Sequence, residues 1–322
     1  MPNFILVAQN TLEVDYVKQA CALAMSIHAT TPNSKISILT DDKVPAKYKG
    51  LFDLIIKIPW GDLANKYDWK IHNRWKTYFI SPYEDAIVLD TDMLVLEDIT
   101  SWYDYLQQYD VFLTSTVYDY RGNKITDTFY RKNFAKHNLP NTYMGLHYFK
   151  QSDFALEFYT WLDTITNNWK EFYKLGGEKQ IQNFASMDLT AAMTVDILDC
   201  KSKVTNENVS VPSFTHMKAN IQGWNDLRES WQTKVGTYFT DDAELYIGNY
   251  KQSGIFHYTE DDFLTDDIGV SYKNKGWINE INSRPDFDIH KVAINSKTNF
   301  TDLFVDKIKD LFIKRVFAER SN

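Results

Sequence analysis

The sequence predicts an α/β fold with a mainly parallel sheet and flanking helices. Short apolar runs that end in polar residues alternate with longer segments whose apolar residues recur at helical spacing. The 322 residues are 44% hydrophobic and 15% aromatic, which is enough to bury a substantial core. Such alternation builds right-handed β-α-β units, and sheets of this kind bind ligands at the carboxyl ends of their strands. We therefore expect the functional site at that edge of the sheet.

The first 120 residues show the clearest alternation. Apolar runs predict strands at Phe4–Ala8, Ile36–Thr40, Leu54–Ile58, Ala86–Leu89 and Asp110–Thr116. The segment Val14–Ala29 predicts a helix, because its apolar residues recur on one face. Residues 60–82 are expected as loop and helix. This order of elements is typical of a nucleotide-binding half-domain of Rossmann style over residues 1–120.

Residues 121–260 alternate less cleanly. Strands are predicted at Met144–Phe149, Val209–Phe214 and Gly254–Tyr258, and helices at Phe154–Trp169 and Met187–Val195. Residues 218–252 are expected to be rich in loops. Residues 261–322 are expected to form an extension that ends in an amphipathic helix over Leu303–Phe317. The basic residues around its apolar stripe suit either docking onto the protein itself or peripheral contact with an anionic membrane.

Charge and cysteine content exclude several classes of protein. A formal net charge of −8 does not suit a protein that coats nucleic acid through bulk electrostatics. Cys21 and Cys200 are the only cysteines, too few for a disulfide framework or a cysteine zinc site. Met1–Val7 has no basic region, so no secretory signal is expected, and no window approaches the roughly 20 apolar residues of a membrane span. We expect a soluble, cytoplasmic protein.

Two acids, Asp90 and Asp92, follow the apolar run Ala86–Leu89. Side chains two apart in an extended chain point in the same direction, so both carboxylates can converge at the carboxyl end of this strand. Neighbouring anions repel each other, and a divalent cation between them relieves the repulsion. A solvated pair in a turn is the alternative. A second apolar run after Asp92 favours the cation site.

Several further stretches follow one another along the chain: Phe4–Asn10 with Tyr16, Arg74 with Lys76, Ile87–Val95, Asn141–Leu146, Met187–Ala192 and Phe256–Thr259. In this order they resemble segments of the GT-A glycosyltransferases, particularly the retaining family that includes glycogenin and bacterial lipopolysaccharide galactosyltransferases. The resemblance implies a GT-A catalytic domain over residues 1–260. Residues 1–120 of that domain would bind the nucleotide, and residues 121–260 would contact the donor sugar and the acceptor.

The resemblance also implies a role for each matched residue. Those expected to bind the nucleotide or its sugar are Ala8, Asn10, Tyr16, Arg74, Lys76, Thr91 and Gly145. Those expected near the reacting carbon are Asn141 and Asp188, and those expected to hold Mn²⁺ or Mg²⁺ are Asp90, Asp92 and His257. His216 is the rival for the third ligand position, or an acceptor-site residue. Asp188 would alternatively serve as a helix cap.

The segment after His257 departs from the family pattern. Glu260–Asp262 stands where the family has a glycine and then a lysine that touches the diphosphate. Phosphate contacts are therefore expected from Lys251, from Lys218 or from elsewhere in the chain. Arg74 and Lys76 are two residues apart and do not share a helix face, so only one of them is expected to point at the diphosphate.

The implied activity is metal-dependent transfer of a hexose from a UDP-sugar to an acceptor hydroxyl, with retention of configuration. The acceptor is left open between a glycan, a lipid-linked sugar, a protein and a modified nucleic acid, and so is the oligomeric state. One alternative is a catalytically silent carbohydrate-binding or partner module on the same fold. Another is a sugar nucleotidyltransferase, although residues 7–20 lack the glycine-rich phosphate loop of that class.

Overall fold

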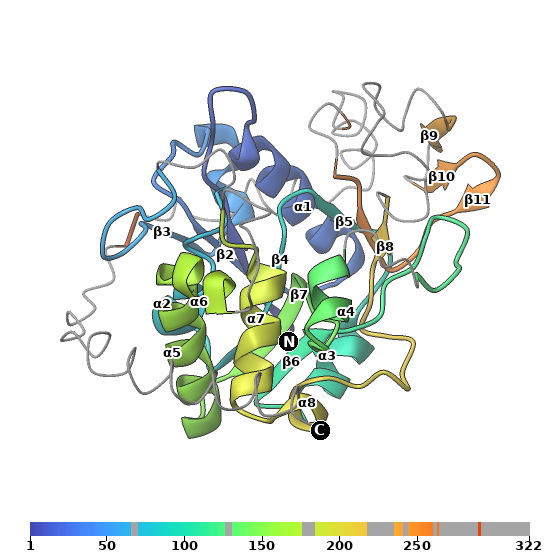
Figure 1. Cartoon of the computed structure of the whole chain (residues 1–322). Coiled ribbons are helices and arrows are strands. Elements are labelled where there is room, and N and C mark those ends of the chain that lie inside the picture. The colour runs from blue at the N-terminus through green and yellow to red at the C-terminus, as the bar shows by residue number, and fades with distance from the viewer. Residues whose placement is uncertain are drawn as a thin grey trace.

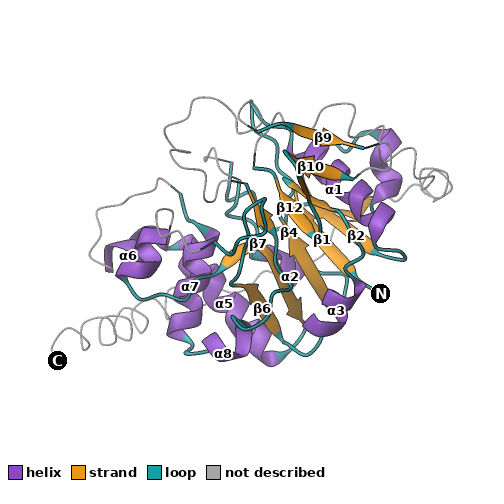
Figure 2. Cartoon of the chain, turned by 90° about the vertical axis from the view of Figure 1, so that its right-hand side faces the viewer, coloured by secondary structure: helices purple, strands orange, loops and turns teal. Residues whose placement is uncertain are grey.

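The computed structural model describes residues 1–65, 70–125, 131–175, 184–217, 235–240, 244–259, 263 and 289–290. Within these residues, seven strands form one sheet with helices on both faces (Figures 1 and 2). In spatial order they are β13 (Ile289–His290), β3 (Leu54–Ile56), β2 (Lys35–Leu39), β1 (Asn3–Val7), β4 (Asp85–Leu89), β7 (Tyr143–Lys150) and β6 (Val111–Thr114). The pairs from β13 to β4 are parallel, whereas β7 runs antiparallel to both β4 and β6. The predicted α/β fold with a mainly parallel sheet is confirmed.

The helices of the described residues follow the strands along the chain. They are α1 (Tyr16–Thr30), the 3₁₀ helix η1 (Ala46–Leu51), α2 (Lys76–Ile80), α3 (Thr100–Leu106), α4 (Lys132–Lys136), α5 (Asp153–Asn167), α6 (Trp169–Leu175), α7 (Met187–Ile197) and α8 (Lys201–Val204). Helix α1 begins where the Asp15 side chain accepts a hydrogen bond from the Lys18 N–H, and Ser152 caps α5 in the same way.

Apolar side chains alternate between the two faces of the sheet. Phe4 and Leu6 of β1 pack in one cluster with residues of α1 and α3, whereas Ile5 packs in a second cluster with residues of α5 and α7. Ile87 and Val88 of β4 divide between the same two clusters. Successive side chains of a strand point to opposite faces, so a strand covered on both faces needs an uninterrupted apolar run. This is why these strands could be read from the sequence.

Two smaller sheets complete the described structure. In one, β12 (Ile255–His257) pairs antiparallel with β5 (Met93–Val95) and parallel with β8 (Thr215–His216). The other is antiparallel and contains β9 (Thr237–Phe239), β10 (Leu245–Ile247) and β11 (Tyr250–Lys251).

Two predictions about this region are wrong. The strand predicted over Val209–Phe214 is irregular chain, and β8 begins only at Thr215. Pro212 has no N–H to donate to a ladder, which disfavours a strand across it. The loop-rich prediction for residues 218–252 fails in the part that the structure describes, because β9, β10 and β11 lie there.

The predicted extension over residues 261–322 contributes to the main sheet, because β13 pairs with β3 at the edge. The helix predicted over Leu303–Phe317, and with it the membrane contact, lies outside the described residues. No helix in the described ranges is both long and apolar enough to cross a membrane. The two predicted halves share one sheet, since β7 of the second half lies between β4 and β6 of the first.

Asp85 fixes the amino end of β4, whose carboxyl end leads to Asp90. Its carboxylate accepts hydrogen bonds from the hydroxyls of Tyr103 (2.6 Å) and Tyr148 (2.8 Å) and from the amide of Asn3 (3.3 Å). These three residues come from α3, β7 and β1. One carboxylate thus ties β4 to both neighbouring strands and to a covering helix.

Candidate metal and ligand site

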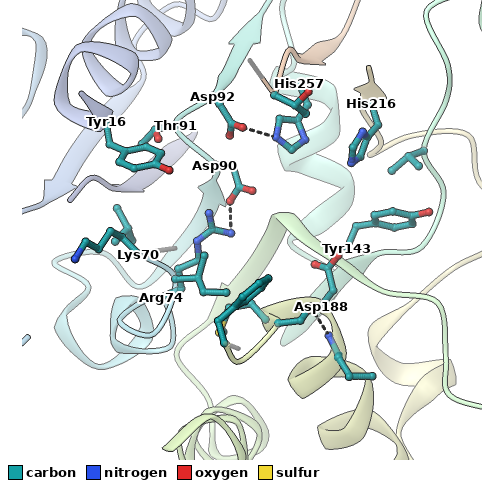
Figure 3. A pocket seen from close by; sticks show the side chains of 18 of the residues that line it. Tyr16, Lys70, Arg74, Asp90, Thr91, Asp92, Tyr143, Asp188, His216 and His257 are labelled. Atoms are coloured by element: carbon teal, nitrogen blue, oxygen red, sulfur yellow. Dashed lines mark hydrogen bonds and ion pairs between the residues drawn. The ribbon is translucent and has the colours of Figure 1, made fainter. Parts of the chain in front are cut away.

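A cavity of about 350 Å³ lies where the chain leaves the carboxyl ends of β1 and β4. Figure 3 shows the arrangement of its lining. Tyr16, Lys70 and Arg74 form one side, and Tyr143 and His216 form the opposite side. The predicted location, at the carboxyl edge of the sheet, is where the structure places this cavity.

The carboxylates of Asp90 and Asp92 and the imidazole of His257 meet in this cavity. One ligand atom from each of the three residues lies within 4.8 Å of the other two. The pairing of β12 with β5 brings them together, since it sets His257 opposite Met93, and the N–H of Tyr258 donates to the carbonyl of Asp92 at 3.1 Å. Two carboxylates and an imidazole are a donor set that suits Mn²⁺. The residues therefore fit a divalent cation.

Each of the two acids has a basic partner. Arg74 forms an ion pair with Asp90, and Nε2 of His257 lies 2.8 Å from Oδ2 of Asp92. Burial raises the pKa of Asp90, although the charge of Arg74 opposes the rise. Burial acts in the same direction on Asp92, but the charge and hydrogen bond of His257 outweigh it and lower the pKa of this carboxyl. Asp92 therefore keeps its negative charge where the cation is expected.

Gly145 makes room for the carboxylate of Asp90. A Cβ at this position would lie 2.9 Å from Cε of Met93 and 3.2 Å from Oδ2 of Asp90. The carbonyl of Gly145 also accepts a hydrogen bond from the Asp90 N–H at 2.9 Å. The glycine is thus explained by close approach to the cluster.

On the side of Tyr16, polar contacts fix the segment that carries Lys70 and Arg74. The amide of Asn73 donates to Oε1 of Gln9 and to Oδ1 of Asp62, both at 2.7 Å. The ammonium of Lys70 donates to carbonyls of the same segment, at Ala64 and Asn65. The result is a fixed wall with two cationic side chains. Thr91 also lines the cavity, and its hydroxyl donates to Gln19.

Asp188, at the start of α7, is held through both oxygens of its carboxylate. Oδ1 accepts from the Met144 N–H at 2.7 Å, and Oδ2 lies 3.0 Å from Nη2 of Arg131. Arg131 also donates to the carbonyl of Thr142, and its guanidinium lies 3.6 Å from the centroid of the Tyr143 ring. Asp188 and Tyr143 are therefore fixed by one arginine.

The cap of α7 is Ser186, whose side chain accepts from the Leu189 N–H. The alternative reading of Asp188 as the helix cap is therefore wrong. His257, rather than His216, belongs to the group of three possible ligands. The His216 ring lies beside it, with centroids 4.9 Å apart, and lines the cavity.

The prediction that Lys76 binds the donor is wrong. The side chain is fully buried, and its ammonium donates to the carbonyls of Pro59 (2.9 Å) and Gly61 (2.6 Å). Burial lowers the pKa of Lys76 to about 8. It fastens the turn at residues 59–61 to α2, away from the cavity.

Gly145, described above, and three further predicted residues do not line the cavity. Ala8 is fully buried beside β2, and the side chain of Asn10 accepts from the Val17 N–H near the start of α1. The amide of Asn141 donates to the carbonyl of Ser115 at 3.3 Å. These residues therefore contact the segments that line the cavity and do not face the cavity themselves.

Of the two lysines expected to replace the family's diphosphate contact, Lys251 does not line the cavity. The ammonium of Lys251 contacts Glu244 at 2.5 Å, and Lys218 lies outside the described residues. Lys70 lines the cavity instead. Its place among the basic residues of 60–82 was the usable signal, although residues 70–75 form turns and not a helix. Arg131 carried no comparable signal, because it lies in none of the matched stretches.

The sequence matches no family profile and no curated protein. Solved structures that resemble it are glycosyltransferases. The galactosyltransferase LgtC, solved with donor and acceptor sugar analogs, is 13% identical with a TM-score of 0.49, covering 88% of this chain and 98% of that one. GlyE of Streptococcus pneumoniae TIGR4 is 11% identical with a TM-score of 0.44, covering 88% of this chain and 63% of that one. Mouse xyloside xylosyltransferase 1 is 10% identical with a TM-score of 0.47, covering 82% and 99%.

Proposed function

We propose that this protein transfers a hexose from a UDP-sugar to an acceptor hydroxyl, with a divalent cation and with retention of configuration. The observation that carries the proposal is the group formed by Asp90, Asp92 and His257 at the carboxyl end of β4. A wall with Lys70 and Arg74 stands beside it. An acidic cation site next to basic side chains is the combination that a nucleoside diphosphate requires.

Asp90, Asp92 and His257 would hold Mn²⁺ or Mg²⁺. The cation would supply Lewis acidity, which stabilises the negative charge that develops on the leaving diphosphate. Arg74 and Lys70 add positive charge on the same side of the cavity. A guanidinium binds phosphate oxygens through two parallel hydrogen bonds, so Arg74 is suited to the diphosphate. The ring of Tyr16 offers a flat, partly polar surface to the base or ribose.

Asp188 and Tyr143 lie farther along the cavity and suit the donor sugar. Glycosyl transfer passes through a transition state with oxocarbenium character, which a nearby anion stabilises. Both oxygens of Asp188 are held by Arg131 and the Met144 N–H, which favours the role of a fixed charge over that of an attacking group. This geometry supports transfer without a covalent protein intermediate.

A thermal-shift screen with UDP, GDP, CDP and ADP, each with and without Mn²⁺, tests the proposal. We expect UDP and Mn²⁺ together to raise Tm, because a ligand at 100 times its Kd stabilises the folded state by about 2.7 kcal/mol. Asp90→Ala or Asp92→Ala should remove the shift. Asp104→Asn is the matched control, because Asp104 is exposed on α3 and this substitution removes the same negative charge.

A Tm shift that survives both aspartate substitutions would overturn the site. The absence of a Tm shift with any of the four nucleotides would overturn the function. Hydrolysis of UDP-glucose or UDP-galactose, followed by NMR of the released sugar, then tests transfer and the retained anomer. Binding of UDP with Mn²⁺ without any hydrolysis or transfer would favour the silent carbohydrate-binding module.

A further inference from the structure

A second groove, of about 290 Å³, lies on the other side of β8 from the cavity. Aromatic, amide, hydroxyl and charged side chains line it, chiefly Tyr120, Tyr250, Arg121, Thr215, Asn249 and Gln252. It is built from the chain at residues 119–122 and from the segment 249–253 that includes β11. None of the roles proposed above for the cation, the nucleotide and the donor sugar uses these residues.

The chain at residues 118–124 has a fixed conformation. A β-bridge joins Tyr118 to Lys124, and the carboxylate of Asp119 accepts hydrogen bonds from the N–H groups of Arg121 and Asn123, both at 2.9 Å. Gly122 has a φ of +81°, which suits glycine at the tip. The turn therefore presents Tyr120 and Arg121 without having to order on binding.

The two tyrosines of the groove are held against each other. The rings of Tyr120 and Tyr250 meet edge to face, with centroids 5.9 Å apart, and Tyr250 is 47% exposed. Arg121 lies over the Tyr120 ring and donates to its hydroxyl from Nε and Nη2. The amide of Gln252 donates to the carbonyls of Tyr120 and Tyr250, both at 2.9 Å. The groove thus offers exposed aromatic surface at low entropic cost.

This chemistry matches a neutral sugar chain. A sugar ring has an apolar face of C–H groups, which tyrosine rings accommodate, and an edge of hydroxyls, which amides and hydroxyls bind. The formal charges of the groove balance, because its lining contains both Asp119 and Arg121, and Lys251 contacts Glu244. A phosphate or a strongly anionic chain would need an excess of positive charge.

The groove and the cavity share two pieces of chain. Val117 and Ile125 line the cavity, whereas residues 119–122 between them line the groove. In β8, Thr215 lines the groove and His216 the cavity. His216 stands on the side of the cavity opposite Tyr16 (Figure 3).

We propose that this groove binds a neutral oligosaccharide, and that this chain is the acceptor, with its reacting end directed past His216 into the cavity. The acceptor role rests on the proposed transferase function. Binding of the oligosaccharide itself does not, because the groove residues are separate from those expected to hold the cation and the nucleotide.

Saturation-transfer NMR with a panel of neutral tetrasaccharides, maltotetraose, cellotetraose, chitotetraose and lacto-N-tetraose, tests the groove. We expect at least one to receive saturation from the wild type. The double substitution Tyr120→Ala with Tyr250→Ala should weaken that binding about tenfold, because both stacking surfaces are lost. Tyr250→Phe keeps the aromatic ring and should retain oligosaccharide binding. Tyr238→Ala is the control, since Tyr238 is 52% exposed on β9 and does not line the groove.

The UDP and Mn²⁺ thermal shift, measured on the same variants, separates the two proposals. Loss of sugar binding in the double variant with an unchanged nucleotide shift supports the groove. No binding of any tetrasaccharide, or binding that the double variant retains, overturns the groove whatever the nucleotide does. Sugar binding in a protein that never responds to nucleotide keeps the groove and overturns the transferase.

Discussion

At the scale of single residues, the clearest constraint is at Gly145, where an added Cβ would contact the carboxylate of Asp90. We expect Gly145→Ala to weaken Mn²⁺ binding about tenfold, because overpacking of this size costs about 1–3 kcal/mol and the carboxylate must move. The fold should survive, since the nearest atom is the flexible end of Met93. Titration with Mn²⁺ followed by electron paramagnetic resonance measures the effect.

Gly236→Ala is the matched control for this substitution. No atom lies within 4 Å of the Cβ that it would add. Equal Mn²⁺ affinity in the two variants would contradict the account of Gly145.

Residues were predictable from the sequence where a local pattern carries their role. Asp90 and Asp92 follow a buried apolar strand, so their placement needed only the alternation of side chains. Arg131 acts through contacts with Asp188 and Thr142, which are distant in sequence, and no local pattern reveals such contacts. Lys76 was misread because the ammonium of a lysine is normally exposed and can reach a ligand. Here the ammonium is buried and donates to two carbonyls.

At the scale of elements, Lys76 joins α2 to the turn at residues 59–61. We expect Lys76→Met to lower the free energy of unfolding by about 2 kcal/mol, because methionine preserves the buried stem but leaves two carbonyls without their donor. Urea unfolding measures the change. Lys43→Met, at an exposed site, removes the same charge and should change stability by less than about 0.5 kcal/mol. Equal effects at the two sites would contradict this role.

Elements were predictable when they were long and strongly periodic. Helices α1, α5 and α7 and the central strands have continuous apolar faces and were found within a few residues of their observed bounds. Helix α3 has seven residues, and Ile99, which precedes its first residue Thr100, provides no side-chain cap, so neither periodicity nor a cap indicated this helix. Strands β9, β10 and β11 have two or three residues each, which is too short for alternation to show.

At the scale of the whole molecule, His147 predicts how stability responds to acid. The ring is fully buried in β7 and hydrogen bonded to the carbonyl of Met144, and burial lowers its pKa from 6.5 to about 3. Between these two pH values the unfolded chain binds a proton that the folded chain excludes. The free energy of unfolding therefore falls as the pH falls, by up to about 1.4 kcal/mol per pH unit.

Substitution His147→Gln removes this titration and keeps an N–H donor. The difference in unfolding free energy between wild type and variant should move by about 2 kcal/mol in favour of the variant from pH ~7 to pH ~5. Urea unfolding across this range measures it. A difference that stays constant with pH would contradict the buried neutral histidine.

The fold class followed from the sequence because alternating strands and helices have few compatible arrangements. The direction of β7 did not, since an apolar run is the same whether its strand is parallel or antiparallel. The position of His257 next to Asp92 depended on the pairing of β12 with β5, which no local pattern states. The family resemblance, rather than the residues themselves, indicated that contact.

The pairing of β12 with β5 also sets the order in which a nascent chain assembles the three candidate cation ligands. Synthesis delivers the amino-terminal residues first, and contacts between distant segments form slowly. Strands β1 to β7 and both aspartates leave the ribosome before β12, which brings His257 to Asp92 across 165 positions. A partly synthesised chain can therefore bury the centre of its sheet while its candidate cation site still has only two of three ligands.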